Sequence, residues 1–182
     1  MSRLPKDERH YWIGTFYALL LPAAERRSKA TYFTPPHLAR SIVALACKNG
    51  FDIKKHTAID PAAGGAAFLS TLASQMRAGG SDASSITKHL CGIELDSGLA
   101  TLSETLIGDQ LGTEIKKRAI VAVGNSLRRI PDKKFDLVLA NPPYGRIFLG
   151  GTSKSQWKDV CHPGHINKYA LFTKLCFRLV KE

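Results

Sequence analysis

The sequence predicts an α/β fold in which a parallel β-sheet carries helices on both faces. From residue 57 onward, short apolar segments that resemble buried strands alternate with segments of helical periodicity, a pattern typical of parallel sheets. Strands are expected at residues 57–59, 90–95, 119–123 and 135–140, and helices at residues 66–76, 97–107 and 167–180. Such sheets bind ligands beyond the carboxyl ends of their strands, so the residues that follow each strand are the first candidates for function.

The first 50 residues are expected to form a helical segment that precedes the sheet domain at residues 51–182. Apolar residues recur at roughly helical spacing within the first 25 residues: Tyr11, Trp12, Phe16, Leu19 and Leu20. A second helix should begin with Thr34 as its N-cap and prolines in its first turn, and should end at Asn49-Gly50. We expect this helix to bury four side chains: Leu38, Ile42, Val43 and Ala46.

Length, composition and charge narrow the class of protein. The chain has 182 residues, 44% of them hydrophobic and 23% charged, which is the size and composition of one globular domain and excludes disordered and fibrous classes. No apolar run approaches the ~20 residues of a membrane span, and the amino terminus has no signal-peptide pattern. The four cysteines form no CxxC pair, so we expect reduced thiols and a cytoplasmic location. The net charge of +11 favours a polyanionic partner.

The loops after the first two strands contain features of a nucleotide-type cofactor site. Residues 60–69 place an acidic residue, a tight glycine turn and a helix start in succession, an arrangement in which backbone can approach a ligand closely. Glu94 stands at the carboxyl end of the second strand, where a carboxylate can accept hydrogen bonds from ribose hydroxyls. These residues fit an adenosine-containing cofactor, but a strand–turn–helix unit with no ligand would also contain them.

The fourth strand runs directly into Asn141-Pro142-Pro143-Tyr144. Two consecutive prolines prevent both helix and ladder hydrogen bonding, so this turn should be rigid. The turn holds an amide side chain, a backbone carbonyl and an aromatic ring in a fixed array. Such an array can accept both N–H bonds of an amino or amide group while Tyr144 stacks on the planar group that bears it.

With these segments in this order, the chain resembles the amino-terminal half of S-adenosylmethionine-dependent adenine-N6 DNA methyltransferases of the restriction–modification type. Five segments carry the resemblance: residues 31–35 with the aromatic-aromatic-Thr-Pro pattern, the 60–69 loop, the 92–96 strand end, residues 123–127 and the 141–144 tetrapeptide. The resemblance implies a class I methyltransferase fold, which is Rossmann-like, and transfer of a methyl group to a flipped-out adenine in DNA.

The resemblance also implies which residues form the site, with no metal among them. The catalytic residues would be Asn141, Pro142, Pro143 and Tyr144, and the residues in contact with the substrate would be Tyr144 and Arg146. The cofactor S-adenosylmethionine would be held by Tyr32, Phe33, Thr34, Pro35, Asp60, Pro61, Ala62, Gly64, Phe68, Glu94, Leu95, Asn125, Ser126, Leu127 and Asn141.

The chain departs from the family pattern at three positions and in length. Ala66 stands where the family has its second loop glycine, so its methyl group is expected to weaken cofactor binding. Asn125 replaces an aspartate beside the cofactor's adenine, and Ala30 stands where glycine is usual. Family members continue through further strands and a target-recognition domain, whereas this sequence ends about one helix after the catalytic turn. A truncated sheet is therefore expected, with a partner chain as a possible source of the missing strands and of target recognition.

Two alternative functions stay open from sequence alone. The same tetrapeptide occurs in enzymes that methylate protein glutamine or ribosomal RNA, although these usually lack the Asp-Pro pair and the aromatic-Thr-Pro segment found here. A truncated, non-catalytic subunit or remnant is the second alternative, because missing strands would leave an exposed sheet edge.

Two further clusters have weaker interpretations. Seven basic residues lie between positions 116 and 134: Lys116, Lys117, Arg118, Arg128, Arg129, Lys133 and Lys134. They could contact phosphates or simply form a solvated face, whereas Arg146, Lys154 and Lys158 are better placed for a substrate phosphate. Cys161, His162 and His165 offer three metal ligands without a fourth, which is a poor zinc pattern.

Overall fold

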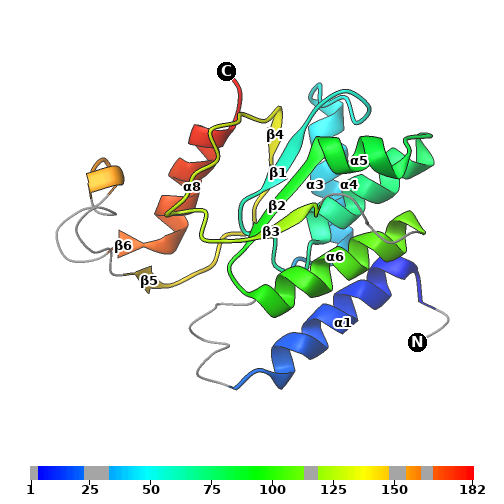
Figure 1. Ribbon diagram of the computed structural model, residues 1–182, viewed down its shortest axis with the longest axis horizontal. Coiled ribbons are helices and arrows are strands. Elements are labelled where there is room, and N and C mark those ends of the chain that lie inside the picture. The colour runs from blue at the N-terminus through cyan, green and yellow to red at the C-terminus, as the bar shows by residue number, and fades with distance from the viewer. Residues whose placement is uncertain (1–3, 23–32, 113–118, 148–154, 161–165) are drawn as a thin grey trace.

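A computed structural model describes residues 4–22, 33–112, 119–147, 155–160 and 166–182 of the chain. Its elements in chain order are α1 (Lys6–Leu20), α3 (Pro36–Lys48), β1 (Ala58–Asp60), α4 (Ala67–Ala78), α5 (Ala83–His89), β2 (Leu90–Glu94), α6 (Ser97–Leu111), β3 (Val121–Val123), β4 (Leu137–Val138), β5 (Arg146–Ile147), β6 (Ile166–Asn167) and α8 (Lys168–Leu179). Figure 1 shows α3 to α6 together on one side of the main sheet and α8 on the other, with α1 lying beside α6.

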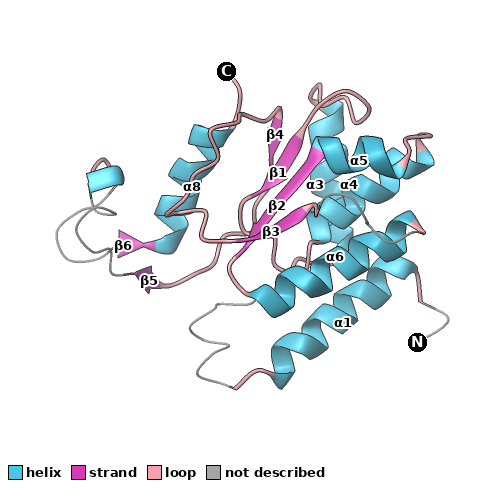
Figure 2. Ribbon diagram, viewed as in Figure 1, coloured by secondary structure: helices cyan, strands magenta, loops and turns pink. Residues whose placement is uncertain are grey.

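The main sheet has the strand order β3-β2-β1-β4, and all three of its strand pairs are parallel (Figure 2). Asp60 pairs in register with Gly92, so the loops after β1 and β2 leave the sheet at the same edge. At the other end of β4, Phe135 forms a parallel bridge with Val180, directly after α8. The predicted α/β fold with a parallel sheet is confirmed.

Two separate apolar clusters cover the two faces of the sheet. One contains Val43 of α3, Leu69 and Met76 of α4, and Ile107 of α6, all nearly inaccessible to solvent. A side chain at Gly92 of β2 would place its Cβ 2.7 Å from a methyl carbon of Leu69; the glycine therefore permits α4 to lie close against the strand.

The second cluster lies on the opposite face, between the sheet and α8. It contains Ile59 of β1, Trp157, and Leu171, Leu175 and Leu179 of α8. The indole N–H of Trp157 donates to the backbone oxygen of Leu127 at 3.1 Å, so this buried ring has its polar atom satisfied. Helices therefore cover both faces of the sheet, as the alternating pattern predicts.

The helix expected from Thr34 to Asn49 forms, but its buried face differs from the prediction. Pro35, not Thr34, is its N-cap. Leu38 is 44% exposed, whereas Ala39 and Val43 are fully buried. The prediction was wrong for Leu38 because α3 packs against α4 through a face of small residues, and spacing alone does not identify which face docks.

The first helix has an unusual distribution of side chains. Its buried positions are His10, Gly14 and Ala18, while five large apolar side chains are exposed: Trp12, Ile13, Phe16, Leu19 and Leu20. A side chain at Gly14 would place its Cβ 3.0 Å from the ring of Phe33. The small inner face of α1 therefore allows close packing on the domain and leaves the large apolar residues at the surface.

The sequence did not predict some elements of the structure, and it predicted others to be longer than they are. Helix α5 and the antiparallel pair β5–β6 were not predicted, and the strand expected at residues 135–140 is reduced to Leu137–Val138. Of the described helices, none has both the length and the apolar character needed to cross a bilayer.

Candidate functional site

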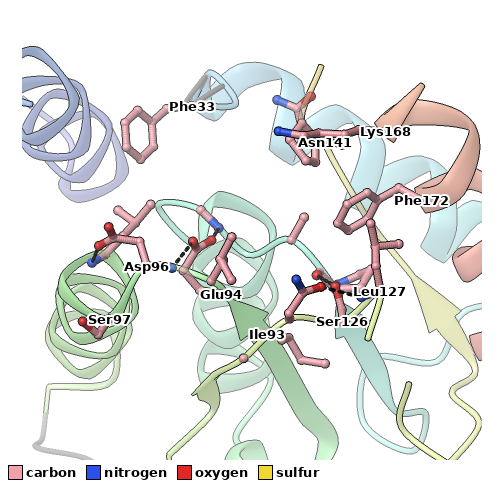
Figure 3. Close-up of a pocket in the computed structure, with 18 of the residues that line it drawn as sticks. Phe33, Ile93, Glu94, Asp96, Ser97, Ser126, Leu127, Asn141, Lys168 and Phe172 are labelled. Atoms are coloured by element: carbon pink, nitrogen blue, oxygen red, sulfur yellow. Dashed lines mark hydrogen bonds between the residues drawn. The ribbon is translucent and has the colours of Figure 1, made fainter. Parts of the chain in front are cut away.

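A cavity of about 550 Å³ lies where the loops after the parallel strands meet (Figure 3). Eleven of the residues predicted for the site line it: Phe33, Pro61, Ala62, Gly64, Glu94, Leu95, Asn125, Ser126, Leu127, Asn141 and Pro143. These residues come from five segments that are far apart in sequence. The structure therefore brings the predicted cofactor segments and the predicted catalytic turn to one cavity.

Asp60, the last residue of β1, does not line the cavity but contacts the loop residue Ala62, which does. The side chain is 2% exposed, and its Oδ1 atom accepts the backbone N–H of Ala62 at 3.0 Å. Burial raises the pKa of Asp60 to about 7; the Ala62 hydrogen bond opposes this shift and the charge of Glu94 adds to it. The carboxyl group holds the 60–64 turn in shape and carries a proton more readily than an exposed aspartate would.

The Glu94 carboxylate is fixed by two backbone groups. Its Oε2 atom accepts the N–H of Gly64 at 2.9 Å, and its Oε1 atom accepts the N–H of Asp96 at 2.8 Å. Gly64 has a φ of 52°, a left-handed conformation that glycine adopts without a steric cost. The loops after β1 and β2 are thus joined through one carboxylate at the cavity wall.

Gly65 and Ala66, the two residues after Gly64, have different surroundings on the side where a side chain projects. A Cβ at Gly65 would lie 2.3 Å from the ring of Phe33, so glycine is required for Phe33 to pack over the loop. Ala66 has a φ of 55° and is fully buried in the core. Its methyl group therefore packs inside the protein and is absent from the cavity lining, contrary to the expectation that it would face the cofactor.

The loop after β3 is anchored to the loop after β1. The hydroxyl of Ser126, which is 3% exposed, donates to the backbone oxygen of Pro61 at 2.7 Å. The Oδ1 atom of Asn125 accepts the N–H of Leu127 at 3.1 Å, a turn that an aspartate at this position could form equally well. Replacement of aspartate by Asn125 therefore preserves the local backbone.

The turn at residues 141–144, predicted to be catalytic, is tied to the start of α3 and to α8. The Asn141 amide nitrogen donates to the hydroxyl of Thr34 at 3.2 Å, and Thr34 is buried. Immediately after the turn, the backbone oxygen of Gly145 accepts the N–H of Lys168 at 2.9 Å. Tyr144 is 56% exposed, so its ring is accessible to a large substrate.

Other predicted residues lie outside the cavity lining. Phe68 belongs to the core, Arg146 lies in β5 and Pro35 is the N-cap of α3. Four others are next to a lining residue in sequence but do not line the cavity themselves: Thr34, Asp60, Pro142 and Tyr144. Tyr32 and Ala30 lie outside the described residues, as do Lys116, Lys117, Arg118, Lys154 and the segment from Cys161 to His165. Arg128, Arg129, Lys133 and Lys134 are exposed. Within the described part of the chain, no group of three potential metal ligands occurs.

Several lining residues were not predicted. Tyr17 and Leu21 come from α1 and its end, and Lys168 and Phe172 from the first turns of α8. The hydroxyl of Tyr17 donates to Asp96 Oδ1 at 2.9 Å, which attaches α1 to the loop after β2. Tyr17 and Leu21 are four residues apart, as are Lys168 and Phe172, so helical spacing alone could have identified these pairs as sharing a face.

The structure resembles solved methyltransferases that are longer than this chain. A protein from Listeria monocytogenes described as a class I S-adenosylmethionine-dependent methyltransferase matches with a TM-score of 0.59 and 20% identity over 82% of this chain and 45% of its own. The M protein of the type I restriction enzyme EcoKI matches with a TM-score of 0.55 and 22% identity over 83% of this chain and 32% of its own. A modification subunit assigned to a type I restriction enzyme of Vibrio vulnificus YJ016 gives 0.64 and 20% over 99% of this chain and 37% of its own.

At these identities the likeness establishes the class I methyltransferase fold, and the chain spans less than half the length of these neighbours. No curated protein sequence matches the chain. The model of the N-6 DNA methylase family, however, matches residues 9–182, a range that includes every segment lining the cavity. The chain therefore belongs to the N-6 DNA methylase family.

Proposed function

We propose that this chain forms the cofactor-binding and catalytic part of a DNA adenine-N6 methyltransferase that uses S-adenosylmethionine. The observation that carries the proposal is the shared cavity, because Asn141 and Pro143 of the catalytic turn line the same space as Gly64 and Glu94. Family membership favours DNA over the glutamine and ribosomal RNA substrates of enzymes with the same tetrapeptide. Residues 1–50 would contribute the aromatic-Thr-Pro part of the site, and residues 51–182 the rest.

The cavity has suitable partners for each part of the cofactor. Glu94, oriented by two backbone N–H groups, would accept the ribose hydroxyls. Leu95 and Asn125 would contact the adenine, and Phe33 with Thr34 would flank the methionine end. When bound, the cofactor would supply an activated methyl group on a sulfonium centre.

The residues of the catalytic turn would activate the target amine by hydrogen bonding. The N6 lone pair of adenine is conjugated with the ring, so the amine is a weak nucleophile. Acceptance of its two N–H bonds by Asn141 Oδ1 and the Pro142 backbone oxygen would favour a pyramidal nitrogen. The contact between Asn141 and Thr34 would fix the amide in the required orientation. Catalysis would then depend on positioning and electrostatic stabilisation, without a strong base.

The substrate base would have to leave the DNA duplex to reach this turn. Flipping costs a few kcal/mol, which stacking on the half-exposed ring of Tyr144 would partly offset. Because this chain covers less than half of each of these fold neighbours, we also propose that target recognition is supplied by additional polypeptide, on the same chain or on a partner, within a restriction–modification system.

Titration calorimetry with S-adenosylmethionine tests the proposal directly. We expect saturable binding by the wild-type chain and a loss of at least tenfold in affinity for Glu94→Ala, because the substitution removes both the ribose acceptor and the link between two loops. Glu8→Ala is the matched control, since Glu8 lies on α1 near Arg40 and outside the cavity. Absence of binding by a wild-type sample that circular dichroism shows to be folded would contradict the proposal.

A further inference from the structure

Lys168 is a cavity-lining residue that none of the sequence motifs includes. It is the first residue of α8 and is half-buried at the cavity wall. Figure 3 shows its side chain directed toward Asn141, at the end of the cavity away from Asp96 and Ser97. A lysine in this position adds a positive charge beside the proposed reaction centre.

The backbone holds Lys168 in a defined position relative to the catalytic turn. Its N–H donates to the oxygen of Gly145 at 2.9 Å. The strands β5 and β6, which follow the turn and precede α8, pair in antiparallel register with Arg146 opposite Asn167. The β5–β6 pair, which begins directly after the catalytic turn and ends directly before Lys168, therefore fixes the position of Lys168 relative to that turn.

The charges around the cavity are separated by sign. Among the described lining residues, the charged side chains are Glu94, Asp96 and Lys168. Glu94 is the last residue of β2 and Asp96 is the N-cap of α6, whereas the lysine lies near Asn141 (Figure 3). A sulfonium ligand is cationic, so an anionic group of a ligand beside the lysine would offset the repulsion between the two positive charges. The α-carboxylate of S-adenosylmethionine and the DNA phosphate next to a flipped nucleotide are the two anionic groups that the proposed reaction brings to this end.

We propose that Lys168 binds an anionic oxygen of a ligand beside Asn141 and so determines how the methionine end of the cofactor or the target nucleotide is oriented. This inference rests on the proposed function, which supplies the ligands. A charge-assisted hydrogen bond from the ammonium group would balance the charge at this end of the cavity. The two sources of the anion predict different binding defects and can be separated.

The test compares Lys168→Gln and Lys168→Arg with Lys174→Gln, a control on the same helix whose ammonium group contacts Asp159 at 2.8 Å outside the cavity. Calorimetry with S-adenosylmethionine and with its decarboxylated analogue measures the carboxylate contribution. Fluorescence titration of a short adenine-containing duplex at several salt concentrations measures the phosphate contribution.

If the anion is the cofactor carboxylate, Lys168→Gln lowers affinity for S-adenosylmethionine about tenfold and leaves affinity for the decarboxylated analogue unchanged. Lys168→Arg then retains most of the wild-type affinity for S-adenosylmethionine. If the anion is a phosphate, affinity for both cofactors is unchanged, while DNA binding weakens and its salt dependence falls by about one charge. A Lys168→Gln chain that equals the Lys174→Gln control in all three titrations overturns this inference. Failure of the wild-type chain to bind S-adenosylmethionine would instead overturn the proposed function.

Discussion

The two ends of the cavity differ in how their polar side chains are held. At the Glu94 end, carboxylate and hydroxyl groups bond to backbone atoms of neighbouring loops, as in the contacts of Glu94 with Gly64 and of Ser126 with Pro61. At the Asn141 end, the Asn141 amide donates to another side chain, Thr34, which is 107 residues away in sequence. The first end is organised by strand ends and tight turns, whereas the second depends on the docking of distant segments.

The largest expected effect concerns Asp60 beneath the first end, and it is a gain in stability. The pKa of Asp60 is raised to about 7 in the folded protein from 3.8, so between these pH values the folded state binds a proton that the unfolded state has released. Stability should fall as pH rises through this window, and the penalty should be complete above pH 7. Asp60→Asn should remove the penalty and stabilise the protein at pH 8 by up to about 4 kcal/mol.

Urea unfolding of wild type and Asp60→Asn between pH 4 and pH 8 measures this difference. The two stabilities should converge near pH 4 and diverge as pH increases, because an asparagine can still accept the Ala62 hydrogen bond but carries no charge. A pH-independent difference would show that the carboxyl group is not buried as described.

At the other end of the cavity, Asn141→Ala should have the largest effect on catalysis. Removal of a positioned hydrogen-bonding group at a reaction centre typically costs about 10²–10³-fold in rate, and the proposed role of Asn141 places it in this class. The measurement is single-turnover methyl transfer to adenine in duplex DNA, together with cofactor affinity by calorimetry. Transfer should be lost while cofactor affinity changes little; near-normal turnover would rule out the proposed role.

Thr34→Val should produce a smaller catalytic defect that isolates the contact between distant segments. Valine keeps the size of threonine but removes the acceptor for the Asn141 amide, so we expect about a tenfold lower transfer rate with cofactor affinity nearly unchanged. Thr101→Val is the control, because Thr101 is exposed and its hydroxyl donates to the Ser97 backbone oxygen within α6. Equal rates for both variants would show that Thr34 does not position Asn141.

The same contrast explains what the sequence could and could not predict. The loop residues Gly64, Glu94 and Asn125 were identified because turn chemistry and strand ends leave a local signal in sequence. The contact of Asn141 with Thr34 has no such signal, since it depends on how α3 is placed against the sheet. The exposure of Leu38 has the same origin, because side-chain spacing defines a helical face but not the partner against which that face packs.

Lining residues on helices were missed for a related reason. Tyr17 lies on a helix that docks on the domain through the small residues Gly14 and Ala18 and leaves its large apolar residues exposed, so apolar spacing did not identify the face that docks. Lys168 precedes an apolar helical pattern and was not distinguished from a solvated first-turn residue. In both cases tertiary packing decides the role of the residue.

The smallest expected effect concerns Ala66, at the loop beneath the Glu94 end. Its left-handed φ of 55° costs an alanine about 1–2 kcal/mol, which Ala66→Gly would relieve. The substitution also removes a buried methyl group worth about 0.8 kcal/mol and increases the entropy of the unfolded chain. The net change in unfolding free energy should therefore be within about 1 kcal/mol of zero.

Comparison with Ala67→Gly makes this small effect interpretable. Ala67 is the first residue of α4, where glycine has no conformational advantage and should destabilise by up to about 1 kcal/mol. In thermal unfolding, Ala66→Gly should be more stable than Ala67→Gly. The affinity of Ala66→Gly for S-adenosylmethionine should stay within about twofold of wild type, because the Ala66 methyl group packs in the core. A tenfold gain in affinity would instead show that this methyl group obstructs the cofactor, and the Glu94 end of the cavity would then be less completely organised than its backbone contacts indicate.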